Sequence, residues 1–107
     1  MEKRTYAIRE KDKTRDVSGY VFDSGIDVPF DILIGVDNRN KGRWYLTGLN
    51  TGLSLGGWFP TRKEALEAYE NRYKKGLQNH AEKSLKDSRE YYSRMIKEFD
   101  SMLGVRK

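Results

Sequence analysis

Apolar and polar positions alternate with a period of two through the first 60 residues, a pattern typical of half-buried strands. The alternation is clearest over 30–36, where every second side chain is bulky and apolar. Turn-forming residues over 37–42 and 50–52 separate this run from the two that follow. Because short connections favour antiparallel neighbours, the pattern predicts a mainly antiparallel sheet of about five strands within residues 4–59.

The rest of the chain follows a helical period. Thr61 and Glu64 have the spacing of a capping box, in which the threonine hydroxyl accepts a hydrogen bond from the glutamate amide. Apolar residues then recur every three and four positions, which predicts a helix near 62–75 that stops or bends at Gly76. A second and longer helix is predicted over 79–103.

The predicted 79–103 helix carries an apolar stripe of nearly four heptads, with one polar position. At 1.5 Å per residue it is roughly 37 Å long, more than a small sheet is expected to cover. We therefore expect the stripe, including Tyr92, Met95 and Phe99, to form a buried seam. Its partner would be the first helix, another protein or a second copy, so a homodimer through this helix is compatible with the pattern.

The length of 107 residues suits one domain, divided into a β meander over 1–60 and a helical part over 61–107. The predicted fold class is α+β, with a five-stranded, mainly antiparallel sheet followed by two C-terminal helices, the last one long. The chain has no cysteine and one histidine, which excludes disulfides, thiolate metal sites and multi-histidine metal sites. No residue pair fits the nucleophile–base arrangement of covalent catalysis. We expect no enzyme activity, cofactor or metal.

No apolar run approaches the ~20 residues of a membrane span, and the first residues lack the apolar segment of a signal peptide. The expectation is therefore a cytoplasmic protein without a membrane partner.

Charge is arranged in blocks along the sequence. The net charge is +5, yet Asp16–Asp37 contains five acids and no Lys or Arg, whereas Asn38–Lys63 contains five bases and no acid. The basic block also contains four large aromatic residues, two of them tryptophan. Basic and aromatic residues in one segment are typical of proteins that contact phosphates and stack on bases. This block is therefore the predicted binding surface for DNA, RNA or a nucleoprotein.

In the predicted strand over 43–49, Trp44 and Leu46 are expected to face inward, and alternation then places Tyr45 and Thr47 outward. Tyr45 and Trp58 are the expected stacking residues. The residues expected to contact phosphate are Arg39, Lys41, Arg43, Arg62 and Lys63.

The strand 43–49, followed by the strand end and helix entry Trp58-Phe59-Pro60-Thr61-Arg62-Lys63-Glu64-Ala65, carries a family resemblance. The segment 43–65 resembles the arm-binding module of phage and conjugative-element integrases, which is similar to the AP2 DNA-binding fold of plants. The resemblance implies a three-stranded sheet packed on one helix, whose sheet face enters the major groove through Arg43, Tyr45 and Thr47. It also implies a small accessory protein of a phage or mobile element, acting in the bacterial host cell.

An alternative function is open at this point. Small anti-CRISPR proteins look similar, and an acidic strand segment can occupy a nucleic-acid channel by imitating its charge. The alternative is thus a protein-binding inhibitor that acts through Asp23, Asp27 and Asp31, or through the long helix.

Overall fold

The computed structural model describes residues 1–107 except 12, 28–31, 41, 84 and 106–107, and it gives no side-chain burial for 80–89, 91–92 and 105. Five strands form one sheet in the order β1-β2-β3-β4-β5, and every neighbouring pair is antiparallel. Their bounds are β1 Glu2–Glu10, β2 Lys13–Asp23, β3 Leu33–Asn40, β4 Arg43–Gly48 and β5 Leu53–Phe59. The predicted α+β fold, with its antiparallel meander and two C-terminal helical segments, is confirmed.

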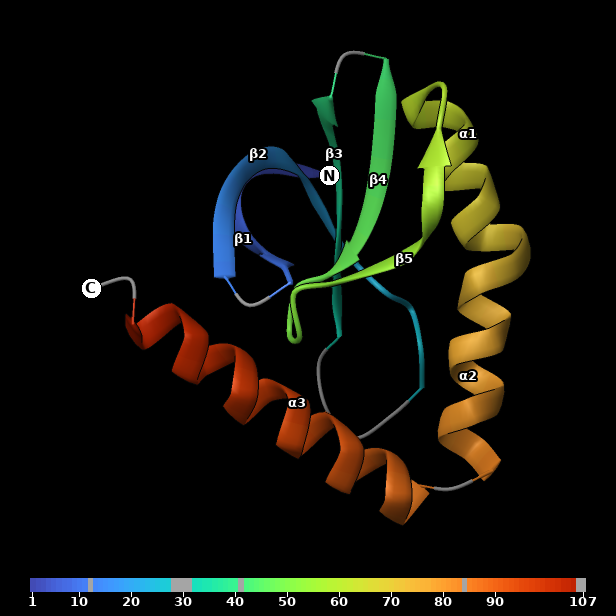
Figure 1. Ribbon diagram of the computed structural model, residues 1–107. Helices are drawn as coiled ribbons and strands as arrows, with labels where there is room; N and C mark the ends of the chain where they lie inside the picture. The colour runs from blue at the N-terminus through green and yellow to red at the C-terminus, as the bar shows by residue number, and fades with distance from the viewer. Residues whose placement is uncertain (12, 28–31, 41, 84, 106–107) are drawn as a thin grey trace.

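One continuous helical rod covers the first face of the sheet (Figure 1). It consists of α1 Arg62–Ala68, the π-helical turn η1 Tyr69–Tyr73 and α2 Lys74–Lys83. As the capping box predicts, Thr61 caps the rod, and its hydroxyl accepts from the Glu64 amide at 3.1 Å. The main core lies between the rod and the sheet, and its fully buried members are Ile32, Ile34, Val36, Leu46, Ala65 and Tyr69.

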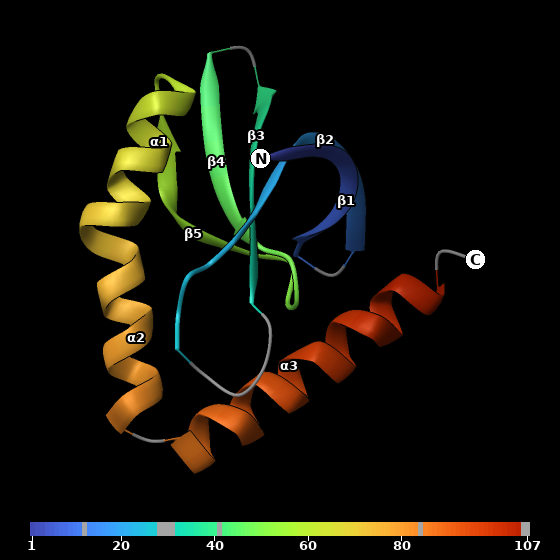
Figure 2. The same ribbon diagram turned by 180° about the vertical axis from the view of Figure 1, so that it is seen from behind.

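The second face of the sheet is covered in part by its own first two strands. β2 pairs with β3 only through its last four residues, whereas most of its length pairs with β1. The β1–β2 hairpin therefore extends past β3 and curls over the sheet, as both ribbon views show (Figures 1 and 2). The amide of Arg9 donates to the carbonyl of Gly52 at 2.9 Å, so the end of β1 meets the β4–β5 turn.

Two glycines allow the curled hairpin to approach the sheet. A Cβ at Gly35 would lie 2.5 Å from the Tyr6 ring, and a Cβ at Gly19 would lie 2.8 Å from the Tyr6 hydroxyl. Any residue larger than glycine at position 19 or 35 would therefore collide with the Tyr6 side chain. Together with Ile8 and Val21 it forms a second, smaller core on this face.

The expected stop at Gly76 is wrong, because α2 runs through Gly76 and the expected cap at residue 79 to Lys83. A glycine inside a helix costs only about 1 kcal/mol relative to alanine. That cost does not end a helix whose neighbouring turns remain hydrogen-bonded and packed on the sheet. The second helix, α3, accordingly begins at Leu85 rather than at residue 79.

Gly76→Ala is expected to raise the free energy of unfolding by up to about 1 kcal/mol, since a methyl group at this position would meet no atom within 4 Å. Urea denaturation followed by circular dichroism measures the change. Gly56→Ala is the opposing control, because Gly56 has φ +71° and an added Cβ would collide with the Tyr73 hydroxyl. A Gly76→Ala protein less stable than wild type would contradict the helical environment described here.

The π-helical turn η1 widens the rod where two tyrosines meet the sheet. Tyr69 packs edge-on against Phe22 at 5.3 Å between ring centroids, and its hydroxyl donates to the Ser24 carbonyl. Tyr73 packs edge-on against Phe59 at 6.4 Å. The two tyrosines are four positions apart, a spacing that places side chains on one face of a helix, and both rings pack on the sheet.

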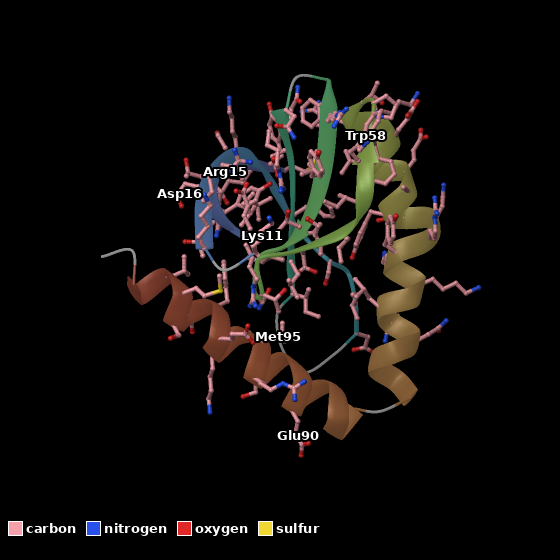
Figure 3. All side chains as sticks on the ribbon, in the orientation of Figure 1. Lys11, Arg15, Asp16, Trp58, Glu90 and Met95 are labelled. Atoms are coloured by element: carbon pink, nitrogen blue, oxygen red, sulfur yellow. The ribbon has the colours of Figure 1, made fainter. Side chains whose placement is uncertain are left out.

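The last helix, α3 Leu85–Val105, runs diagonally below the sheet, and Met95 points from it toward the strands whereas Glu90 points away (Figure 3). Phe99 is buried as expected, but against the β4–β5 turn and Arg9 rather than the first helix. Met95 is half-buried, and the Tyr92 side chain lies outside the described residues. None of the helices in the described part of the chain is long and apolar enough to cross a membrane.

Candidate nucleic-acid interface

Two aromatic rings and two cations lie together on the face of the sheet opposite the helical rod, each ring with one cation over it. Tyr45 in β4 and Trp58 in β5 are cross-strand neighbours in register. The guanidinium of Arg43 lies 5.0 Å from the centroid of Trp58, and that of Arg39 lies 4.4 Å from the centroid of Tyr45. We call these four residues, Arg39, Tyr45, Trp58 and Arg43, the aromatic ladder.

The ladder lies where β4 begins and β5 ends, near the start of α1, as the position of Trp58 shows (Figure 3). Trp58 is 50% exposed, although a tryptophan is usually covered in a folded domain. Arg43 is exposed and Tyr45 is half-buried. The sheet therefore presents an aromatic ring and a cation to solvent on one rigid surface.

Arg39 has a second, structural role that the sequence analysis missed. Its Nε lies 2.9 Å from Asp37 Oδ2, one of its terminal nitrogens lies 2.9 Å from Asp37 Oδ1, and that nitrogen also donates to the Thr47 hydroxyl at 3.0 Å. The Arg39 side chain is 9% exposed and that of Asp37 is fully buried. Its charge is thus largely compensated inside the protein, so Arg39 is placed to orient Tyr45 rather than to bind phosphate.

Tyr6 completes this buried network. Its hydroxyl donates to Asp37 Oδ1 at 2.7 Å. Burial, followed by the hydrogen bond and charge of Asp37, raises the pKa of Tyr6 far above its usual value. The hydroxyl therefore stays protonated and remains a donor, which ties the β1–β2 hairpin to the strand that carries Arg39.

Thr47 lies on the same face of the sheet as Arg43 and Tyr45, as expected, but it is not exposed. It is fully buried beside Gly35, where the Tyr6 ring rests. The curled β1–β2 hairpin thus covers a residue that the family resemblance assigns to the major groove. Asn40, which the sequence analysis did not single out, adds to the ladder by donating from Nδ2 to the Tyr45 hydroxyl at 3.2 Å.

Two further predicted cations, Arg62 and Lys63, belong to α1 and are not on the ladder's face. The Arg62 guanidinium lies 4.6 Å from the ring centroid of Tyr20, which packs on the helix-covered side of the sheet. Lys63 is exposed, and both cations border a shallow depression that also includes Glu67 and Glu70. Lys41 lies outside the described residues.

Asp23 lies at the opposite end of β3 from the aromatic ladder, because it pairs with Leu33 whereas Arg43 pairs with Asn40. Asp23 accepts a hydrogen bond from the Gly25 amide at 2.7 Å and shapes the loop after β2. The backbone of Asp27 makes two hydrogen bonds with the side-chain amide of Gln78, at 2.6 and 3.2 Å. Both aspartates are exposed, and Asp31 lies outside the described residues.

Within the described residues, no group of three His, Asp or Glu side chains is arranged to hold a metal ion. Comparisons with protein-family models, with curated proteins and with solved structures gave no match.

Proposed function

We propose that this chain is a small, non-catalytic binding protein that engages nucleic acid through the aromatic ladder and the basic residues near it. The observation that carries the proposal is the half-exposed Trp58, held against the exposed guanidinium of Arg43 on a rigid sheet. Stacking on aromatic rings and pairing of cations with phosphates are the two interactions that nucleic-acid binding combines.

The arrangement of β3, β4, β5 and α1 supports this proposal. These elements are the last three strands of the five-stranded sheet and the helix packed on them, and the resemblance to integrase arm-binding modules implies such a set of three strands and one helix. The aromatic ladder lies on the face away from that helix. We therefore propose an accessory protein of the kind that phages and mobile elements carry, acting within the bacterial host.

The alternative of an inhibitor that imitates nucleic acid has less support in the contacts. Such an inhibitor needs a row of carboxylates directed at its partner, whereas the Asp23 carboxylate already accepts a hydrogen bond from the Gly25 amide of its own loop. The ladder end, by contrast, combines an exposed ring with an exposed cation.

The test is a salt titration of binding to random-sequence DNA and RNA oligonucleotides, followed by fluorescence anisotropy. Arg43→Gln is expected to lower the log–log salt slope by about 0.7–0.9, which corresponds to one lost phosphate contact. The double variant Asp37→Ala/Arg39→Met, which removes both charges of the buried pair together, should change the slope little, since Asp37 already compensates the Arg39 charge.

Lys97→Gln is the matched control, because it removes an exposed positive charge from α3, away from the ladder. It should leave both affinity and slope near the wild-type values. A wild-type protein that binds neither DNA nor RNA at low salt would refute the proposal. The inhibitor alternative would then be tested with Asp23→Asn and Asp27→Asn.

A further inference from the structure

We infer that the nucleic acid this protein binds is single-stranded, with unpaired bases stacking on the exposed part of the aromatic ladder. The inference rests on the proposed function and names the class of ligand for that same surface. Three observations carry it: the chemistry of the exposed side chains, the compensation of Arg39, and the position of the β1–β2 hairpin.

The exposed groups suit base faces rather than base edges. In a duplex the faces of the bases are covered by their neighbours, and a groove presents only hydrogen-bonding edges. A side chain that reads an edge needs a free donor or acceptor. Asn40, the amide beside the ladder, uses one of its N–H groups on the Tyr45 hydroxyl, and the large exposed ring of Trp58 offers mainly a flat apolar face. Trp58 therefore matches a base that has left the stack.

The charge of the ladder is too small for a duplex binder that relies on phosphates. Asp37 compensates Arg39 through two hydrogen bonds of 2.9 Å, so Arg43 supplies the exposed charge of the ladder. Proteins that bind duplex DNA without reading bases depend on many phosphate contacts. Binding at the ladder must instead draw much of its free energy from stacking, which requires unpaired bases.

The β1–β2 hairpin covers part of the sheet face that carries the ladder, so less of this face is accessible to a nucleic acid. Inserting the sheet into the major groove would require contact across β3, β4 and β5, a region that includes Gly35 and Thr47. Both residues are buried, and Tyr6 from β1 rests directly on Gly35. The hairpin thus covers the middle of this face, and the ladder at its open end presents one aromatic ring and one cation, which fits a single strand better than the major groove of a duplex.

The ladder is also held in place before any ligand arrives. Thr47 and Asp37 fix the Arg39 guanidinium, which lies over the Tyr45 ring, and Asn40 holds the Tyr45 hydroxyl. Because these side chains are already ordered, binding loses little of their conformational entropy. A base that stacks on Trp58 would extend an existing stack that begins at Arg43.

The experiment compares one labelled 12-nucleotide strand with the same strand annealed to its complement, in DNA and RNA versions, by anisotropy at one low salt concentration. We expect each single strand to bind at least tenfold more tightly than its duplex. Trp58→Ala should weaken single-strand binding by about 5- to 150-fold, the range for losing one stacked base, while leaving the salt slope unchanged.

A second readout uses intrinsic fluorescence, since the chain has two tryptophans and Trp44 is packed against the core. Single strands should quench the emission of the wild-type protein. Trp58→Phe should retain most of the affinity, because phenylalanine still offers a stacking face, but it should lose the quenching. This variant separates stacking from a general effect on folding.

The outcomes separate the inference from the proposed function. Duplex binding equal to or tighter than single-strand binding, or unchanged single-strand affinity in Trp58→Ala, would overturn the inference while the proposed function stands. Absence of binding to all four ligands would overturn both. The difference between the DNA and RNA arms identifies which strand the ladder prefers.

Discussion

Asp37→Ala is expected to lower the free energy of unfolding by about 3–5 kcal/mol, because it removes one partner of a buried ion pair. The Asp37 carboxylate accepts two hydrogen bonds from Arg39 and one from Tyr6, and it is fully buried. Without it, the Arg39 guanidinium would remain nearly buried, and among the described residues it would keep the Thr47 hydroxyl as its hydrogen-bond acceptor. Urea denaturation of both proteins, monitored by circular dichroism, measures the loss.

The double variant Asp37→Ala/Arg39→Met tests whether the loss in Asp37→Ala comes from the unpaired Arg39 charge. It removes both charges, so it should recover part of the stability that the single variant loses. Asp100→Ala controls for the loss of an acid, since Asp100 is exposed, and should change stability by less than about 0.5 kcal/mol. A loss in Asp37→Ala no larger than that of the control would contradict the buried network.

The second large effect is expected for Phe99→Ala, which should cost about 3–5 kcal/mol, the usual range for truncating a buried phenylalanine. Phe99 is 4% exposed, and its ring lies so close to the β4–β5 turn that a Cβ at Gly52 would be 2.5 Å from a ring carbon. The ring also lies under the Arg9 guanidinium at 5.7 Å from its centroid. Denaturant titration gives the magnitude, and Met102→Ala, at a half-buried position, should cost less.

A thermal melt of the wild-type protein at several concentrations distinguishes contacts of Phe99 within the chain from contacts between copies. The structure places Phe99 against its own chain, so the melting temperature of the wild-type protein should not rise with protein concentration. A clear rise would show that α3 packs on a second copy. An unchanged melt in Phe99→Ala would show that the ring is not buried in solution.

The secondary structure was predictable because its signals are local. The alternation over 30–36 and the turn residues on either side of β4 determine the meander, and Thr61 with Glu64 marks the helix start to the residue. The predicted helix boundaries were wrong where contacts between distant parts of the chain override the local preference of a residue. Gly76 reads as a helix stop, yet the rod continues, and nothing in the apolar spacing indicates the π-helical turn at Tyr69–Tyr73.

The candidate site was predictable in part. Cross-strand pairing brings Tyr45 beside Trp58, as the hairpin pattern implies, and Arg43 follows from alternation along β4. The pairing of Arg39 with Asp37 was missed because the charge blocks were divided between residues 37 and 38. Residues two apart on a strand share a face, so this ion pair was within reach of the sequence. The burial of Thr47 could not be predicted from the sequence, because it depends on the curl of the β1–β2 hairpin.

Arg9, which lies over the Phe99 ring, joins β1 to α3, two parts of the chain that are far apart in sequence. Arg9 contacts Glu98 at 2.8 Å across 89 positions, and it also donates to the Met95 carbonyl at 3.3 Å. During synthesis, the first hairpin therefore leaves the ribosome long before the helix that covers Arg9. Closing so long a loop is entropically slow compared with forming the meander, so the docking of α3 is expected to be a late step of folding. The Arg9 side chain is 8% exposed in the folded protein, but until α3 docks it stays open to water on β1, the edge strand of the sheet. A charge on an edge strand disfavours pairing with other chains, so Arg9 is expected to protect the incomplete sheet from aggregation.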